Sequence, residues 1–183
     1  MSTQTRPKAT LKDLARVPGK AELVNGEIVH MPPTGDEPGT AGDEIYFSLR
    51  QHVQKTGVGH AVSDNKAFVV DLPNRQSVSP DAAYYTGPRG GMKFYPEPPD
   101  FAAEVRSEGD YGPSAERAMA NKRADYFAAG TLVVWDVDLK SEDVVRKYTA
   151  TDPEHPTVFR RGGIADAEPA VPGWRMMVDD MFR

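Results

Sequence analysis

The sequence contains no cysteine, and its four histidines are scattered without forming a ligand motif. These absences exclude disulfide bonds, thiolate zinc sites and a cysteine nucleophile. Any metal would therefore be a hard, oxygen-bound ion such as magnesium or manganese. No apolar run approaches the roughly 20 residues that cross a bilayer, and residues 1–12 are polar, without a hydrophobic signal core. We therefore expect a cytoplasmic protein with no membrane partner.

Neither composition nor charge departs far from that of an ordinary globular protein. Of the 183 residues, 39% are hydrophobic and 27% are charged. The net charge of −5 argues against a broad basic surface that coats nucleic acid. It leaves a local site open, because carboxylates that hold divalent cations count as negative in the bare sequence. We expect residues 1–19 to form a tail with a short helical turn, and residues 20–183 to form one domain.

Hydrophobic patterning and turn residues predict an α/β fold with a mixed sheet. Asn25-Gly26, between two short strand-like runs, is the strongest short-range signal for a β-hairpin. A strand over 101–107, a helix over 114–129 and a strand over 131–137 imply a right-handed crossover to a parallel neighbour. Residues 31–39 are rich in proline and glycine and should form a loop. The other expected elements are a helix through about residue 55, one or two strands within 58–72, a strand over 79–85, an antiparallel pair at 144–149 and 157–160, and a closing segment over 171–181.

Three residues in these elements carry chemistry: Asp81 at the start of a strand, Glu104 inside another, and Lys122 on the apolar stripe of the helix over 114–129. A buried ammonium is strongly unfavourable unless an anion meets it. Two carboxylates can hold divalent ions that polarise a phosphate and lower the pKa of an attacking water. A lysine beside them can orient that water or stabilise developing charge. The trio therefore indicates metal-assisted hydrolysis of phosphodiesters.

Each member of the trio also has an interpretation without chemistry. Asp81 follows Pro80 and fits a turn or the start of a strand. Glu104 fits a solvent-facing strand residue paired with Arg106. Lys122 fits a side chain whose stem lies along the stripe while its ammonium reaches water.

The order of these parts resembles the PD-(D/E)xK nuclease superfamily and, within it, the large bacterial Uma-type family of restriction-endonuclease-like proteins. The resemblance covers residues 20–140 and rests on Glu22-Leu23-Val24-Asn25-Gly26-Glu27, Pro80-Asp81, Pro99-Asp100-Phe101-Ala102-Ala103-Glu104-Val105, the block 122–126, Gly130 and Trp135-Asp136-Val137-Asp138. It implies a restriction-endonuclease-like core, in which a central mixed β-sheet is flanked by helices and preceded by an N-terminal β-hairpin.

The resemblance also implies a site. Asp81 and Glu104 would bind Mg²⁺ or Mn²⁺, with the Val105 carbonyl as a third ligand. The superfamily's usual lysine lies two residues after the glutamate, where this sequence has Arg106. Proteins that resemble this chain supply the lysine from the following helix instead, which matches Lys122. Because arginine cannot act as a base at neutral pH, Arg106 would at most bind phosphate.

Several other charged residues are weighed against this site. Glu22 in the hairpin is a further acidic candidate for catalysis, as similar glutamates are in parts of the superfamily. Asp100 lies four residues from Glu104, about 13 Å along a strand, which is too far for the same metal. Asp136 and Asp138 are expected to be loop or cap residues at the end of a strand. Four C-terminal basic residues could meet a DNA backbone but fit a solvated surface better, namely Arg146, Lys147, Arg160 and Arg161.

The sequence therefore predicts a metal-dependent DNA endonuclease of the restriction type. A homodimer is expected, because cutting a duplex needs two sites and symmetric dimers are the commonest oligomers. Two alternatives stay open. Arg106 at the usual lysine position and the acidic net charge fit a catalytically inactive nuclease-fold module for binding or assembly. The same residues would also suit a metal-dependent phosphoesterase that acts on small substrates, and fold alone does not decide among these.

Overall fold

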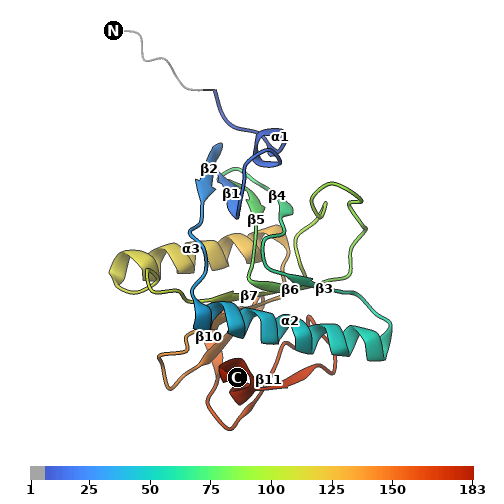
Figure 1. The fold of residues 1–183 in the computed structure, drawn as a ribbon, viewed down its shortest axis with the longest axis vertical. Coiled ribbons are helices and arrows are strands. Elements are labelled where there is room, and N and C mark those ends of the chain that lie inside the picture. Colours follow the sequence, from blue (N-terminus) through green and yellow to red (C-terminus); the bar gives the residue numbers. More distant parts are fainter. Residues whose placement is uncertain (1–6) are drawn as a thin grey trace.

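The computed structural model describes residues 7–183, which form three β-sheets and two long helices (Figure 1). Residues 1–6, at the start of the expected tail, lie outside the described part. Along the chain the elements are α1 (Leu11–Leu14), β1 (Ala21–Val24), β2 (Glu27–His30), α2 (Asp36–Thr56), β3 (His60–Ser63), β4 (Phe68–Leu72), β5 (Arg75–Val78), β6 (Ala82–Tyr85), β7 (Phe101–Val105), α3 (Pro113–Ala129), β8 (Val133–Val137), β9 (Val145–Thr149), β10 (Asp152–Phe159), β11 (Ile164–Asp166), β12 (Arg175–Met177) and the 3-10 helix η1 (Val178–Phe182).

The central sheet is mixed and has the strand order β10-β9-β8-β7-β6-β3. Strands β7 and β8 are parallel and are joined through α3, as the strand, helix, strand succession predicted. All the other neighbours in this sheet are antiparallel, including the expected pair β9 and β10. The fold class inferred from the sequence is therefore confirmed.

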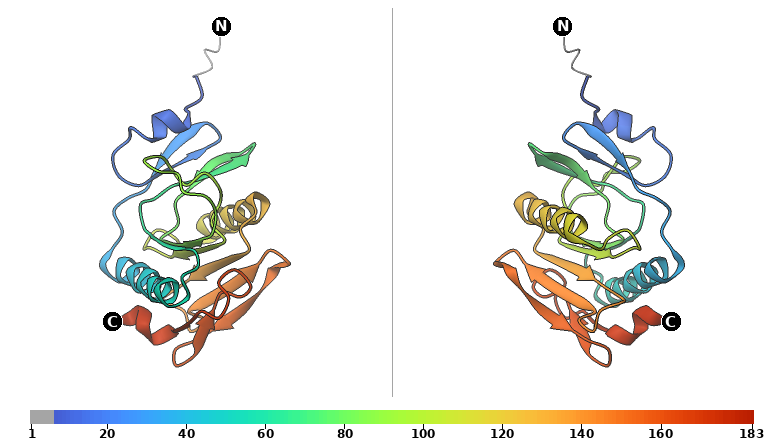
Figure 2. Two further views of the ribbon diagram at one scale, coloured as in Figure 1. Left: turned by 90° about the vertical axis from the view of Figure 1, so that its right-hand side faces the viewer. Right: turned by 90° about the vertical axis from the view of Figure 1, so that its left-hand side faces the viewer.

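A smaller sheet with the order β2-β1-β5-β4 lies at the N-terminal end of the molecule (Figures 1 and 2). It contains the predicted hairpin, whose turn residues Asn25 and Gly26 both have positive φ angles, 53° and 76°. Two successive positive φ angles are the geometry that favours Asn-Gly in a two-residue hairpin loop. The small sheet has its own apolar cluster, formed by Leu14, Ala21 and Leu23.

Strand β5 was not predicted, because its sequence Arg-Gln-Ser-Val contains a single hydrophobic residue. Two of its polar side chains, those of Arg75 and Ser77, are nevertheless buried and hydrogen-bonded. Ser77 is fully buried, and its hydroxyl oxygen accepts a hydrogen bond from the backbone N–H of Leu23 at 2.8 Å. Strand β5 therefore ties β1 to β4, and the strand that was expected over 79–85 begins only at Ala82.

The two long helices cover opposite faces of the central sheet (Figure 2). Helix α2 packs Ile45 and Leu49 into a large cluster with Trp135 and Trp174, whose rings stack with centroids 5.0 Å apart. Helix α3 contributes Tyr126 to a second cluster on the other face. These two clusters hold the strands that carry the candidate site.

Two expectations about individual segments were wrong. The helix α2 begins at Asp36, inside the segment expected to be a loop, because its first turn tolerates a proline at Pro38 where the N–H needs no helical partner. Asp136 lies within β8, not in a loop or cap. Along α3, Tyr126 is the buried residue, and much of the apolar stripe borders a cavity.

None of the helices in residues 7–183 combines the length and the apolar character needed to cross a lipid bilayer.

Candidate active site

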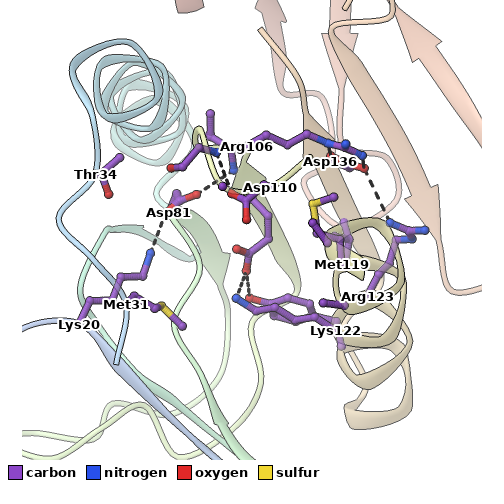
Figure 3. Close-up of a pocket in the computed structure, with 18 of the residues that line it drawn as sticks. Lys20, Met31, Thr34, Asp81, Arg106, Asp110, Met119, Lys122, Arg123 and Asp136 are labelled. Carbon is purple, nitrogen blue, oxygen red and sulfur yellow. Dashed lines mark hydrogen bonds and ion pairs between the residues drawn. The ribbon is translucent and has the colours of Figure 1, made fainter. Parts of the chain in front are cut away.

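The candidate site lies in a cavity of about 460 Å³ between α3, the carboxyl end of β7 and the segment that follows β2 (Figure 3). Charged residues from both sheets line it, and apolar residues form part of its wall. The charged and hydroxyl side chains include Lys20, Asp81, Glu104, Arg106, Lys122 and Tyr126, and the apolar ones include Val29, Met31, Pro32, Ala115, Ala118 and Met119.

The register of β6 and β7 brings Asp81 next to Glu104. Ala82 pairs with Ala103, so one further step along the antiparallel ladder sets Asp81 opposite Glu104 on the same face of the sheet. The backbone N–H of Asp81 donates to the carbonyl of Ala103 at 3.1 Å, which continues the ladder beyond β6. One oxygen of Asp81, Oδ2, accepts a hydrogen bond from the N–H of Val105 at 2.7 Å. The residues predicted as carboxylate ligands are therefore neighbours, with the Val105 backbone beside them.

Lys122 reaches this place from α3. Its Nζ lies 2.8 Å from Oε1 of Glu104 and 2.9 Å from Oε1 of Glu22. Burial acts to lower the pKa of Lys122, but the charges of Glu104 and Glu22 outweigh it and raise the pKa above its ordinary value. The ammonium therefore stays protonated and does not extend into water as the interpretation without chemistry supposed.

Glu104 is held by two groups on one side. Oε1 accepts the contact from Lys122 and a hydrogen bond of 2.5 Å from the hydroxyl of Tyr126, four residues further along α3. Burial raises the pKa of Glu104, the charge of Lys122 opposes that rise, and the nearby Asp81 adds to it, so that the pKa ends above its usual value. Glu104 pairs with Lys122 and Tyr126, whereas the alternative interpretation had paired it with Arg106.

Glu22 is buried on β1, and both of its oxygens are engaged. Oε2 lies 2.6 Å from NH1 of Arg75, and Oε1 accepts a hydrogen bond from the backbone N–H of Ser79 at 2.8 Å in addition to the contact with Lys122. Arg75 in turn binds Asp125 on α3 at 2.8 Å. This chain of contacts fastens the small sheet to α3 and fixes the position of Lys122.

Lys20 is a member of the site that the sequence did not point to. It stands just before β1, and its Nζ lies 2.6 Å from Oδ1 of Asp81 and 2.7 Å from Oδ1 of Asp64. Among residues 7–183, Asp81 forms its ion pair with Lys20, and Lys122 pairs with the two glutamates instead. Burial acts to lower the pKa of Lys20, but Asp81 and Glu104 raise it above the ordinary value. Two ammonium groups therefore face the two predicted ligands.

Arg106 is 8% exposed and is held by carboxylates on both sides. Its Nε and NH2 donate to the two oxygens of Asp136, each at 2.8 Å, and its NH1 and NH2 contact Glu116 at the start of α3. Four of its five N–H groups are used in this way. Binding of phosphate by Arg106 stays a prediction, which would have to use the remaining N–H or displace the half-exposed Glu116.

Of the residues that were weighed and set aside, Asp136 lines this cavity and binds Arg106, whereas the others do not line it. Asp100 accepts two hydrogen bonds from Thr86, and Asp138 accepts one from Tyr111. The four C-terminal basic residues all have carboxylates as neighbours within the chain, in the pairs Arg146–Asp138, Lys147–Asp166, Arg160–Asp143 and Arg161–Asp179.

In the described part of the chain, no three side chains of the histidine, cysteine, aspartate or glutamate type converge in a way that could hold a metal ion by themselves. A cation at this site would draw on Asp81 and Glu104 and complete its shell with backbone, water or substrate oxygens. Mg²⁺ commonly binds in this way, through one or two carboxylates together with substrate phosphates.

Comparison with known proteins agrees with this architecture. A family model named Uma2 and described as "Putative restriction endonuclease" matches residues 11–179. The chain is also similar to the 1.96 Å crystal structure of "a putative nuclease belonging to DUF820" from Anabaena variabilis, with a TM-score of 0.73, 16% sequence identity, and coverage of 94% of this chain and 97% of that chain. No curated protein matches. At this level of identity, the structural likeness shows the fold alone.

Proposed function

We propose that this chain, which belongs to the Uma2 family, is a metal-dependent DNA endonuclease with the PD-(D/E)xK type of site. The family match agrees with the resemblance seen in the sequence and supports a nuclease. One observation carries the finer proposal. Asp81 and Glu104 stand side by side at the end of β7, and the ammonium of Lys122 lies 2.8 Å from Glu104.

The ion pairs that include the two predicted ligands support a divalent ion. The two ion-pair networks that contain Asp81 and Glu104 have more carboxylates than cations, namely Glu22, Asp64, Asp81, Glu104 and Asp125 against Lys20, Arg75 and Lys122. With all of them ionised, five acids against three bases leave two negative charges, which one Mg²⁺ or Mn²⁺ would balance. Asp81, Glu104 and the Val105 carbonyl would hold it, and the ion would polarise the phosphate and lower the pKa of a bound water.

Lys122 is suited to bind and orient, not to accept a proton. Its raised pKa keeps the ammonium charged, and an ammonium has three N–H donors. Glu104 and Glu22 take two of them, which leaves one for a phosphate oxygen or for the attacking water. Such a donor stabilises negative charge that develops on the phosphate in the transition state. Glu22 fixes the ammonium of Lys122 through an ion pair, and the hydroxyl of Tyr126 orients Glu104 through a hydrogen bond.

The proposed substrate is DNA and the proposed assembly is a homodimer. A site that cuts one strand must be present twice to cut both strands, and a two-fold dimer supplies the second copy. Analytical ultracentrifugation with and without a DNA duplex tests this assembly directly.

The function is tested by incubating supercoiled plasmid with the purified protein and Mg²⁺ or Mn²⁺. Asp81→Asn and Lys122→Met should each lower the cleavage rate by about 10³-fold or more, since residues that act as a unit lose activity together. Asp71→Asn, an exposed substitution on β4, is the matched control and should cleave normally. Circular dichroism shows whether each variant is folded.

Undiminished cleavage by both folded variants would exclude this site. A wild-type protein that is folded, binds no Mn²⁺ in calorimetry and cleaves nothing would instead support the inactive binding or assembly module. Activity on mononucleotide esters without activity on plasmid would favour the small-substrate phosphoesterase.

A further inference from the structure

Lys20 occupies the position at Asp81 that a divalent ion would need. Its ammonium lies 2.6 Å from Oδ1, while Oδ2 accepts the hydrogen bond from the N–H of Val105 (Figure 3). Both oxygens of Asp81 are therefore engaged. A magnesium ion lies about 2.1 Å from a carboxylate oxygen, so an ammonium on the same oxygen would repel it at short range.

Glu104 differs from Asp81 in this respect. Its two contacts, from Lys122 and from Tyr126, both use Oε1, and no described residue donates a hydrogen bond to Oε2. A cation can therefore approach Glu104 without moving Lys122. The obstacle to a cation lies at Asp81, and it is a single side chain, Lys20.

Lys20 also has a second carboxylate to hold it. Asp64 follows β3, is 38% exposed, and its Oδ1 lies 2.7 Å from the ammonium. If Lys20 leaves Asp81, its charge stays paired with Asp64. Displacement therefore requires only a small movement of one flexible side chain and leaves no unpaired buried charge.

We propose that Lys20 is an internal cation that competes with divalent ions for Asp81 and thereby sets the metal affinity of the site. This inference rests on the proposed function, in which Asp81 is a metal ligand. Lys20 is a positioning residue in this scheme, because it acts through Asp81. With Lys20 on Asp81 the carboxylate is neutralised, and with Lys20 on Asp64 the carboxylate is free to bind the ion.

The first test compares Mn²⁺ binding by isothermal titration calorimetry in the wild type and in Lys20→Gln. Glutamine keeps most of the side chain and removes its charge. The variant should bind Mn²⁺ at least about fivefold more tightly, the low end of coupling between two interacting sites. Lys12→Gln, at an exposed position of α1, makes the same change in net charge and should leave the affinity unchanged.

The second test uses Asp64→Asn, which changes a partly exposed residue and leaves the buried charges in place. With Asp64 neutral, Lys20 has only Asp81 as its carboxylate partner, so Mn²⁺ should bind more weakly. A simple field effect of Asp64 on the ion would give the same loss whether or not Lys20 is present. In the double variant Lys20→Gln/Asp64→Asn, we expect the effect of Asp64→Asn to fall to less than half of its size in the wild type, on a logarithmic scale.

The outcomes separate this inference from the proposed function. Saturable Mn²⁺ binding of equal affinity in the wild type and in Lys20→Gln overturns the role of Lys20 alone. Absence of saturable binding in both proteins overturns the metal-dependent function and this inference with it. If Lys20→Gln does not fold, Lys20→Met replaces it in both comparisons, with the same expected results. Unchanged Mn²⁺ binding in Asp64→Asn refutes the inference whichever Lys20 variant is used.

Discussion

Arg106 neutralises a carboxylate inside the fold, and its removal should be costly. Its Nε and NH2 donate to Asp136, each at 2.8 Å, and the two side chains are only 6% and 8% exposed. Arg106→Met would leave Asp136 with one weaker cationic neighbour, Arg123, at 3.9 Å. Breaking one partner of a buried ion pair destabilises a protein by about 3–5 kcal/mol. Because Arg123 remains, we expect a loss of about 3 kcal/mol, at the low end of that range.

The contacts of Arg106 with Glu116 add little to this figure. Glu116 is 52% exposed, and exposed ion pairs contribute about 0–1 kcal/mol. Arg106→Lys keeps the charge but loses the bidentate hydrogen bonding to Asp136. It should therefore lose about one charge-assisted hydrogen bond, or about 1.5–3 kcal/mol. The lysine variant thus has a smaller expected loss than the methionine variant.

The assay is equilibrium unfolding in urea, followed by tryptophan fluorescence. Trp135 is fully buried and precedes Asp136 in β8, so its emission reports on this part of the core. The double variant Arg106→Met/Asp136→Leu removes both charges and should recover most of the stability lost in Arg106→Met. A loss below about 1 kcal/mol in Arg106→Met, or a double variant whose loss equals the sum of the two single losses, would refute this reasoning.

Two further predictions concern other contacts. Tyr126→Phe removes the hydroxyl that donates to Glu104 at 2.5 Å. If Glu104 acts as proposed, the variant should lower kcat about 5- to 30-fold with little change in KM, because one hydrogen bond that orients the carboxylate is worth about 1–2 kcal/mol. Plasmid cleavage under saturating substrate measures this, and an unchanged kcat would show that Glu104 is oriented without the hydroxyl. Burial acts to raise the pKa of Asp166, but hydrogen bonds from Lys147 and from the N–H of Glu168 outweigh it and hold the pKa below its ordinary 3.8. A lowered pKa contributes stability that is present above the unfolded value and is lost as pH falls through the folded value, so the stability advantage of the wild type over Asp166→Asn should shrink between roughly pH 6 and pH 2. Urea unfolding across this range measures it, and a difference independent of pH would contradict the assignment.

The parts of the fold that could be predicted from the sequence depend on short-range signals. Asn25-Gly26 specifies its own turn, and the strand, helix, strand order from β7 to β8 leaves one favoured connection. The proximity of Asp81 to Glu104 follows once β6 and β7 are paired in antiparallel register. The hairpin turn and the crossover required no knowledge of distant contacts, whereas the pairing of β6 with β7 did.

The parts that could not be predicted depend on contacts between residues far apart in the chain. Lys20 meets Asp81 across 61 residues, and Arg75 meets Glu22 across 53. No local pattern encodes such partners, and β5 itself lacks a hydrophobic signature. Tyr126 is different, because it lies four residues after Lys122 on the same helix face and could have been identified as its companion. The apolar stripe of α3 does not by itself tell a cavity from a packed core, because small and apolar side chains can line either.

The residues around the cavity belong to two structural units. Lys20 and Glu22 come from the small sheet, which has an apolar cluster of its own, whereas Asp81, Glu104 and Lys122 come from the central sheet and its helix. The segment 31–35 connects these units after β2. Detachment of the N-terminal hairpin would remove Glu22 from Lys122 and Lys20 from Asp81. The cluster around Trp135 and Trp174, between α2 and the central sheet, would stay intact. Partial opening at this junction should therefore inactivate the protein at a lower denaturant concentration than the one that unfolds it.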